Sequence, residues 1–281
     1  MKWNILYRGP LSSCNYECSY CPFAKTKNTR AELLDDEQKL LKFEAWVNAQ
    51  QQHNIGILFT PWGEGLIRKH YQQVMTRLSH QPMVDKVAIQ TNLSSTLDWM
   101  REVNTDAFAL WTTFHPTQIS LSAYLDRCEK LNSMGINYSV GMVGLKEDFE
   151  LIQEMRDRLA PHVYLWVNAY KREEGYYTEE DLNFLNKIDP HFHFNAVRHP
   201  SYGEACRAGY SSFSIDGDGA VTRCHFIKNK LGNIYETPLE EMVKRTPCSN
   251  DTCGCYIGYI NMDKLGLDNV YQGKILERIA I

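Results

Sequence analysis

The stretch Cys14-Asn-Tyr-Glu-Cys18-Ser-Tyr-Cys21 places three cysteines at gaps of four and three residues near the N-terminus. A loop with this spacing can turn all three sulfurs toward one point. Three thiolates hold three irons of a cubane iron–sulfur cluster, which normally takes four protein ligands. The next cysteine is Cys128. The pattern therefore predicts a cluster with one open iron, at which a small molecule binds.

A zinc site is the alternative interpretation of the same stretch. Structural zinc takes four cysteine or histidine ligands that lie close together. No histidine occurs before His53. The spacing therefore favours the iron–sulfur cluster over zinc.

Tyr20, just before the third cysteine, completes the pattern CxxxCx(aromatic)C. Here the chain resembles the radical S-adenosylmethionine (SAM) superfamily. The resemblance implies that Cys14, Cys18 and Cys21 hold a [4Fe–4S] cluster whose open iron chelates SAM, with Tyr20 among the cofactor-binding residues. It also implies that SAM is split into methionine and a 5′-deoxyadenosyl radical. A one-electron reductant such as flavodoxin or ferredoxin is then an expected partner.

Composition narrows the class of protein. The chain has 281 residues, of which 43% are hydrophobic, and a formal net charge of −4. This length fits one large domain, or a domain of about 200 residues with a smaller one. The charge gives no electrostatic footprint for nucleic acid, and no apolar run is long enough for a membrane-spanning helix. Nine cysteines without a signal segment indicate a cytoplasmic protein that binds metal rather than forming disulfides.

The first two-thirds of the chain alternates β-like runs with helical stretches. The expected strands are Trp3–Tyr7, Ile55–Phe59, Val84–Gln90, Ala107–Thr113, Tyr138–Val143 and Val163–Val167. The expected helices are Ala31–His53, Ile67–Ser79, Leu121–Met134 and Asp148–Leu159. Such alternation predicts an α/β fold with a parallel sheet and right-handed crossovers. The resemblance implies a partial (β/α)6 TIM-like barrel; an open doubly wound sheet is the alternative that the pattern leaves open.

Catalytic groups of parallel α/β folds gather at the carboxyl ends of the strands. The second expected strand runs into Pro61-Trp62-Gly63-Glu64-Gly65, which resembles the Gly-Gly-Glu motif of the superfamily with Trp62 in place of its first glycine. The resemblance implies that Gly63 and Glu64 receive the methionine ammonium group of SAM through charge-assisted hydrogen bonds. In the alternative interpretation, Glu64 stabilises the N-terminus of the helix that follows.

The next two strands also end in polar residues. Gln90-Thr91-Asn92 resembles a Thr-Asn-Gly segment with Leu93 in place of the glycine, which makes Asn92 a candidate for the SAM pocket. A turn or helix cap is its alternative role. Thr113 and His115 follow the fourth strand, where the superfamily places a ribose-binding group. His115 is also the candidate catalytic residue, because imidazole titrates near neutral pH.

The fifth strand contains Val140-Gly141-Met142-Val143-Gly144, which resembles a GxIxG segment that packs its backbone against adenine. Glycine permits such close approach, so Gly141 joins the candidate SAM-binding residues; a glycine-punctuated core strand is the alternative. Lys171 and Arg172 follow the sixth strand, and either meet an acidic substrate or form a solvated charge cluster. Cys128 falls on the apolar face of an expected helix and is interpreted as a core residue.

Five cysteines gather in the last third of the chain: Cys206, Cys224, Cys248, Cys253 and Cys255. Phe213 and Ile215 alternate with polar residues before Asp216-Gly217-Asp218-Gly219, which is a strong turn signal. A hairpin is therefore expected between the first two of these cysteines. The turn lacks the later ligands of an EF-hand loop, which disfavours calcium.

This hairpin and the later phrase Leu231-Gly232-Asn233-Ile234 resemble the SPASM/twitch extension of radical SAM enzymes. The resemblance implies a small α+β domain with one auxiliary [4Fe–4S] cluster. The expected ligands are Cys206, Cys224, Cys253 and Cys255, with Cys248 as a substitute. A full SPASM domain with two clusters has a CxxCxxxxxC run that is absent here, which favours the twitch form. Structural zinc is the alternative at this site.

The expected domains are a radical SAM core over residues 1–175, a bridging segment over 176–200, an auxiliary cluster domain over 201–262 and a C-terminal segment over 263–281 that packs on the core. The expected function is a radical SAM enzyme that abstracts a substrate hydrogen, and so oxidises or cross-links a peptide or oxidises a small metabolite. Neither nucleic acid nor a membrane is an expected partner. A zinc-binding scaffold or regulatory protein is the alternative from another class.

Overall fold

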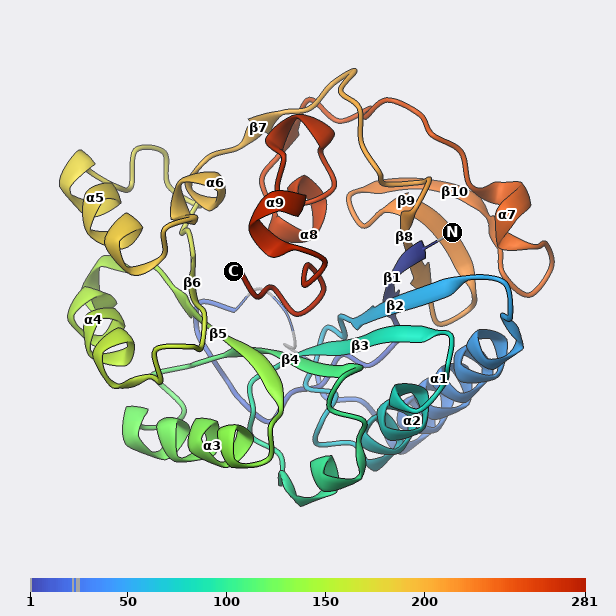
Figure 1. Ribbon diagram of the computed structural model, residues 1–281, viewed down its shortest axis with the longest axis horizontal. Helices are drawn as coiled ribbons and strands as arrows, with labels where there is room; N and C mark the ends of the chain where they lie inside the picture. The colour runs from blue at the N-terminus through green and yellow to red at the C-terminus, as the bar shows by residue number, and fades with distance from the viewer. Residues whose placement is uncertain (1, 22, 24–25) are drawn as a thin grey trace.

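The computed structural model describes residues 2–21, 23 and 26–281. Within these residues, the main feature is a curved sheet of nine strands in the order β10-β9-β8-β1-β2-β3-β4-β5-β6 (Figure 1). The strands from β1 to β6 are all parallel to their neighbours. They are β1 (Lys2–Arg8), β2 (Asn54–Phe59), β3 (Val84–Thr91), β4 (Phe108–Thr113), β5 (Asn137–Val143) and β6 (Leu165–Asn168). The parallel α/β sheet predicted from the sequence is confirmed, with small shifts at the strand ends.

Helices cover the outer face of the sheet. They are α1 (Arg30–Ala49), α2 (Lys69–Ser79), α3 (Leu121–Ser133) and α4 (Phe149–Arg158), with the short 3₁₀ helices η1 (Asp98–Glu102) and η2 (Lys146–Asp148). Thr29 and Glu32 form a capping box at the start of α1, which satisfies N–H groups that have no partner within the helix. Helix α1 ends at Ala49, earlier than expected, because Gln50 adopts an extended backbone and leads toward β2.

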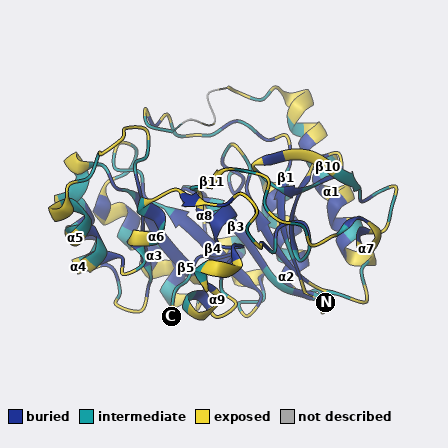
Figure 2. Ribbon diagram, turned by 90° about the horizontal axis from the view of Figure 1, so that it is seen from above, coloured by how far each residue is buried: buried dark blue, intermediate teal, exposed yellow. Residues whose placement is uncertain are grey.

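The two faces of the sheet pack against different parts of the chain. Successive residues of a strand point to opposite faces. Ile5 and Ile57 belong to the core beneath the helices, whereas Leu6, Leu58 and Trp111 belong to a second core shared with the C-terminal segment. A doubly wound sheet carries crossover helices on both faces. The arrangement is therefore an open partial barrel, with exposed residues along the outer sides of the helices (Figure 2).

The C-terminal third adds strands to the same sheet. It begins with α5 (Glu179–Ile188), α6 (Phe192–Ala196) and β7 (His199–Pro200). The expected hairpin is present as β8 (Ser212–Asp216) and β9 (Ala220–Cys224), and β10 (Ile227–Asn233) follows it. Strand β8 pairs with β1 in parallel, so the hairpin extends the barrel sheet, which the sequence pattern did not predict. The remaining elements are α7 (Leu239–Met242), β11 (Thr252–Cys253), α8 (Tyr256–Tyr259), η3 (Asp263–Leu265) and α9 (Asp268–Tyr271).

The C-terminal segment lies inside the curve of the sheet (Figure 1). Ile275 and Leu276 are buried in the second core. The hydroxyl of Ser139 on β5 donates a hydrogen bond to the carbonyl oxygen of Glu277 at 2.7 Å, and the Glu277 carboxylate lies 3.4 Å from Nζ of Lys86, near the start of β3. The segment therefore fills the barrel toward the amino ends of its strands.

The domain boundaries at residues 175, 200 and 262 stay predictions. Within the part of the chain that the structure describes, no helix combines the length and apolar character that crossing a membrane requires.

Candidate active site and cysteine cavities

The first three cysteines lie on the loop between β1 and α1, at the carboxyl ends of the parallel strands. Two side chains hold the start of this loop. The buried carboxylate of Asp36 accepts a hydrogen bond from the backbone N of Leu11 at 3.1 Å. Oδ1 of Asn28 accepts from the backbone N of Ser12 and of Ser13, both at 2.8 Å. The chain therefore enters Cys14 in a defined direction.

The loop after β2 lies against the cysteine loop. The backbone N of Gly63 donates to the carbonyl oxygen of Leu11 at 3.3 Å, and the backbone N of Glu64 donates to that of Ser13 at 3.1 Å. A Cβ atom on Gly63 would overlap the backbone of Ser13. Glycine is needed there for this close approach of two backbones.

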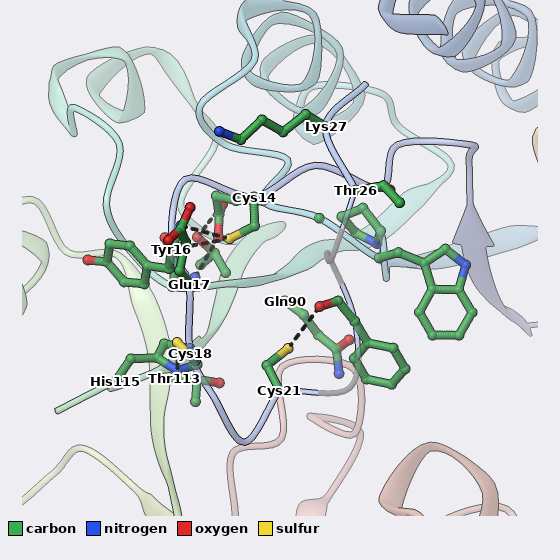
Figure 3. Close-up of a pocket in the computed structure, with 17 residues that line it drawn as sticks. Cys14, Tyr16, Glu17, Cys18, Cys21, Thr26, Lys27, Gln90, Thr113 and His115 are labelled. Carbon is green, nitrogen blue, oxygen red and sulfur yellow. Dashed lines mark hydrogen bonds between the residues drawn. The ribbon is translucent and has the colours of Figure 1, made fainter. Parts of the chain in front are cut away.

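The structure brings Cys14, Cys18 and Cys21 to one cavity of about 350 Å³. Figure 3 shows their side chains around the same opening, with His115 beside Cys18. Sγ of Cys18 lies 3.4 Å from Nδ1 of His115, and Sγ of Cys14 accepts a hydrogen bond from the backbone N of Tyr16 at 3.4 Å. The predicted SAM-site residues Gly63, Glu64, Asn92, Thr113 and His115 line this same cavity.

Burial governs the charge of these thiols. It raises the pKa of Cys14, and the hydrogen bond from Tyr16 opposes the shift. Burial also raises the pKa of Cys18, which the Tyr20 hydroxyl partly offsets. Metal binding requires the thiolate form. The positive charge of a bound metal would therefore have to offset the burial.

Glu64 is buried beside the cavity, and its carboxylate binds three protein donors. Oε1 accepts from the backbone N of Leu66 at 3.0 Å and from Oγ1 of Thr91 at 2.8 Å, while Oε2 accepts from the backbone N of Asn92 at 2.7 Å. Burial raises the pKa of Glu64, and these hydrogen bonds oppose the shift. Helix α2 begins only at Lys69, so Glu64 joins the ends of β2 and β3 rather than capping that helix.

Asn92 reaches the cysteine loop from the end of β3. Its Nδ2 lies 3.6 Å from Sγ of Cys14 and donates to Oδ1 of Asn15 at 3.2 Å. The next residue, Leu93, has a left-handed backbone with φ of 56°. Glycine adopts this conformation freely, and a leucine does so at a cost of about 1 kcal/mol. The site that resembles Thr-Asn-Gly therefore keeps the glycine conformation, held by a hydrogen bond from the backbone N of Leu93 to Oγ1 of Thr91 at 3.0 Å.

His115 contacts the aromatic residue of the cysteine motif. The hydroxyl of Tyr20 lies 2.8 Å from its Nδ1. Burial lowers the pKa of His115 to about 4, so the imidazole is neutral at pH 7. This does not support proton exchange near neutral pH, which was the chemical reason for predicting a catalytic role. His115 keeps its place at the cavity, and its role stays a prediction.

Gly141 lies apart from this cavity. A Cβ atom there would overlap the indole ring of Trp166 on β6. Gly141 therefore permits the close packing of Trp166 in this structure. Its predicted contact with adenine stays a prediction.

All five C-terminal cysteines line a second cavity of about 340 Å³. Backbone pairing places three of them: Cys206 forms a bridge with Met262, Cys253 of β11 pairs with His199 of β7, and Cys224 ends β9. Cys128 is buried in the core beneath the helices, as expected. The structure thus brings together every cysteine that the sequence assigned to the second centre.

Comparisons with known proteins agree with this architecture. Residues 206–257 match the family model SPASM, an iron–sulfur cluster-binding domain. The structure "Native anSMEcpe with bound AdoMet" aligns with a TM-score of 0.53 at 15% identity, covering 85% of this chain and 80% of that chain. A second anSMEcpe structure, with AdoMet and the Cp18Cys peptide, gives a TM-score of 0.55 at 15% identity over 86% and 80%. The chain therefore shares the fold of the anSMEcpe structures, and residues 206–257 are similar to SPASM iron–sulfur cluster-binding domains.

Two further comparisons add little. The BtrN complex with AdoMet and 2-DOIA aligns over 85% of this chain and 81% of that chain at 16% identity, but its TM-score of 0.38 is too low to support an argument. No curated protein matches the sequence.

Cysteine side chains line both cavities. Within residues 2–21, 23 and 26–281, no three cysteine, histidine, aspartate or glutamate side chains are placed to hold one metal ion. Four thiolates around zinc would each lie about 2.3 Å from it. The donor set of the SPASM-type domain matches the cysteine ligands of iron–sulfur clusters.

Positive charge surrounds the second cavity. Lys171, Arg198 and Arg223 line it, and none of its described lining residues is an aspartate or glutamate. Nζ of Lys171 donates to the carbonyl oxygen of Gly254 at 2.5 Å, and burial lowers its pKa to about 8. The adjacent Arg172 donates from Nη2 to the carbonyl oxygen of Tyr20 at 2.8 Å. Residues 171 and 172 thus bind one cysteine segment each, which rules out a purely solvated charge cluster.

Sequence reasoning missed several residues that hold the first cysteine loop. Asp36 had a readable signal, because it falls at helical spacing with Leu40, Phe43 and Val47 on the buried side of α1. Asn28 had none, since its partners in the loop are set by tertiary contacts.

Proposed function

We propose that this protein is a radical SAM enzyme, which cleaves SAM reductively at a [4Fe–4S] cluster held by Cys14, Cys18 and Cys21 and abstracts a hydrogen atom from a substrate. The observation that carries this proposal is the single cavity at the carboxyl ends of the strands. The three cysteines line it together with Glu64 and Asn92. The fold supports the proposal, because the anSMEcpe structures that share it hold AdoMet.

When bound and reduced, the cluster supplies the electron that splits SAM. The chain holds the site in shape around it. A carboxylate has about four acceptor positions, and Glu64 uses three of them on the protein, so one remains for the ammonium group of SAM. Asn92 fixes the cysteine loop through Asn15. Thr113 and the neutral His115 offer hydrogen-bonding groups in the same cavity.

An auxiliary [4Fe–4S] cluster in the SPASM-type domain is the second part of the proposal. Its ligands would come from Cys206, Cys224, Cys253 and Cys255, with Cys248 as a substitute. The family description, the cavity of about 340 Å³ and the three cations on its wall support it. Four thiolates make such a cluster anionic, and nearby cations stabilise an anionic centre. No observation favours the zinc scaffold.

The substrate is proposed to be a peptide or a small metabolite, which is oxidised or cross-linked. The anSMEcpe complex with the Cp18Cys peptide supports the peptide class, although at 15% identity the likeness itself concerns the fold alone. A one-electron reductant such as flavodoxin or ferredoxin would supply the electron.

Anaerobic reconstitution tests the proposal. The protein should be brown, hold about eight irons if both cubanes form, and release 5′-deoxyadenosine from SAM after reduction. Replacing Cys14, Cys18 and Cys21 with Ala should abolish this release and remove about half of the iron. Replacing Cys206 and Cys224 with Ala should remove the other half.

Cys128→Ala is the matched control, because Cys128 lies outside both cavities; this variant should keep both clusters. A colourless wild-type protein that holds two zinc ions and does not cleave SAM would contradict the proposal.

A further inference from the structure

A third cavity, of about 560 Å³, adjoins both cysteine cavities. Trp62 lines it and also lines the first cavity. Ile227 lines it and also lines the second. A molecule in this third cavity would therefore contact one wall residue of each cysteine cavity.

Arg8 stands on the wall of this third cavity at the end of β1. Its Nε donates to the carbonyl oxygen of Thr60 at 2.7 Å, and its guanidinium carbon lies 3.9 Å from the ring centroid of Trp62. Burial lowers the pKa of Arg8 to about 10, so the group is still positively charged at pH 7. The Trp62 ring holds one face of the guanidinium group, which fixes its plane.

No protein carboxylate pairs with this cation. The ion pairs of the described residues leave Arg8 out, and among those residues only its Nε has a hydrogen-bond partner. The Nη1 and Nη2 groups therefore remain for a ligand. A partly buried charge without a partner is costly, and a bound anion would offset that cost.

The acidic residues of the third cavity are engaged elsewhere. Asp216 accepts from the backbone N of Asp218 at 3.0 Å and of Ala220 at 2.9 Å. Asp218 forms an ion pair with Lys39 at 3.0 Å. Nε2 of His225 lies 3.3 Å from Oγ1 of Thr60. Neither aspartate forms an ion pair with Arg8; the thiol of Cys255, a proposed cluster ligand, is the acidic group whose charge acts on Arg8.

We propose that Arg8 binds a carboxylate group of the substrate, with Trp62 as the surface that orients the guanidinium. This inference rests on the proposed function and narrows its substrate class to molecules that carry a carboxylate. A planar guanidinium with two available Nη groups matches the two oxygens of a carboxylate. The two side chains would then place the substrate in the third cavity.

Tryptophan fluorescence of the reconstituted protein can test this at constant ionic strength, with acetate as the probe. Acetamide is its neutral counterpart, and inorganic phosphate separates carboxylate binding from phosphate binding. We expect a saturable response to acetate that acetamide does not give and that disappears in Trp62→Phe. Arg8→Met should weaken acetate binding about tenfold, because a charged hydrogen-bond partner is lost.

Lys39→Met is the matched control. Its ammonium group lines the same cavity but is already paired with Asp35 and Asp218, so acetate affinity should stay unchanged. If Arg8→Met does not fold, acetate binding is measured in Arg8→Lys. This variant keeps the positive charge but cannot donate two parallel hydrogen bonds to one carboxylate. Weaker acetate binding in that variant supports the proposal, and unchanged binding overturns it.

Other results would also overturn the inference. An equal response to acetamide would show that charge is not recognised, and tighter binding of phosphate would show that the class is wrong. A tenfold loss of SAM affinity in Arg8→Met would show that the bound carboxylate is that of SAM. Cleavage of SAM by the wild type is measured separately, so acetate binding without SAM cleavage would contradict the proposed function and not the carboxylate site.

Discussion

The hydroxyl of Tyr20 lies 2.8 Å from Nδ1 of His115, and the two rings are nearly parallel at 9°. Burial raises the pKa of Tyr20, so the phenol stays protonated. The aromatic residue of the cysteine motif thus contacts a buried imidazole that follows β4.

This pair predicts a pH dependence of stability. The pKa of His115 is about 4 in the folded protein and 6.5 in a model compound. Between these values the unfolded chain binds a proton that the folded chain does not. The free energy of unfolding should therefore be unaffected above pH 6.5 and should fall as pH drops from 6.5 to 4, by up to about 1.4 kcal/mol per pH unit. Urea unfolding of the metal-free chain, compared with His115→Asn, measures this contribution. Parallel pH profiles of the two proteins would contradict it.

Glu64→Gln should destabilise the protein by about 1–3 kcal/mol. An amide has only one acceptor oxygen. Its NH2 group would therefore face at least one of the three protein groups that now donate a hydrogen bond to the carboxylate. Glu17→Gln is the control, because Glu17 is an exposed carboxylate on the same cavity. It should change the free energy of unfolding by less than about 0.5 kcal/mol. Equal effects of the two substitutions in urea unfolding would count against the role of Glu64 in joining β2 and β3.

Asp36→Asn should loosen the first cysteine loop. The buried carboxylate accepts from the backbone N of Leu11 and lies 3.0 Å from Nε2 of His70. The amide keeps one acceptor oxygen and turns an NH2 group toward at least one of these partners. An unsatisfied buried partner costs about 1–3 kcal/mol, so we expect a loss of that order together with a lower iron content at the first centre. Asp35→Asn removes a neighbouring exposed carboxylate, which pairs with Lys39 at 2.8 Å, and should leave the iron content unchanged. Normal iron loading of Asp36→Asn would refute the link to the cysteine loop.

Gly141→Ala should destabilise the protein by about 1–3 kcal/mol through overpacking. The new methyl group would overlap the ring of Trp166, which is held by a hydrogen bond from Nε1 to Oγ of Ser139 at 3.2 Å and by Arg278, whose guanidinium carbon lies 4.1 Å from the ring centroid. Adding Trp166→Leu to Gly141→Ala should restore part of the loss, because the smaller side chain makes room. Thermal unfolding of both variants measures this, and additive losses would show that the two residues do not clash.

The pattern of residues close together in the chain was enough to predict much of the fold. The alternation of β-like and helical stretches predicted β1 to β6, because a strand and a helix each have their own period of buried residues. The turn signal at residues 216–219 predicted the hairpin of β8 and β9 in the same way. Positions of Glu64, Asn92 and His115 after successive strands predicted that they gather at one cavity, since parallel strands bring their carboxyl ends to one edge.

The sequence by itself determined the cysteine spacing, the alternation of strands and helices and the hairpin, because each depends on residues close together in the chain. Only the tertiary structure decided that β8 pairs with β1, that Trp166 covers Gly141 and that Arg8 stacks on Trp62. These pairings join residues far apart in sequence. The local sequence pattern around one partner therefore does not predict the other. Glu64 is a further example. The sequence predicted its position after β2, but only the tertiary structure shows its hydrogen bonds to the end of β3.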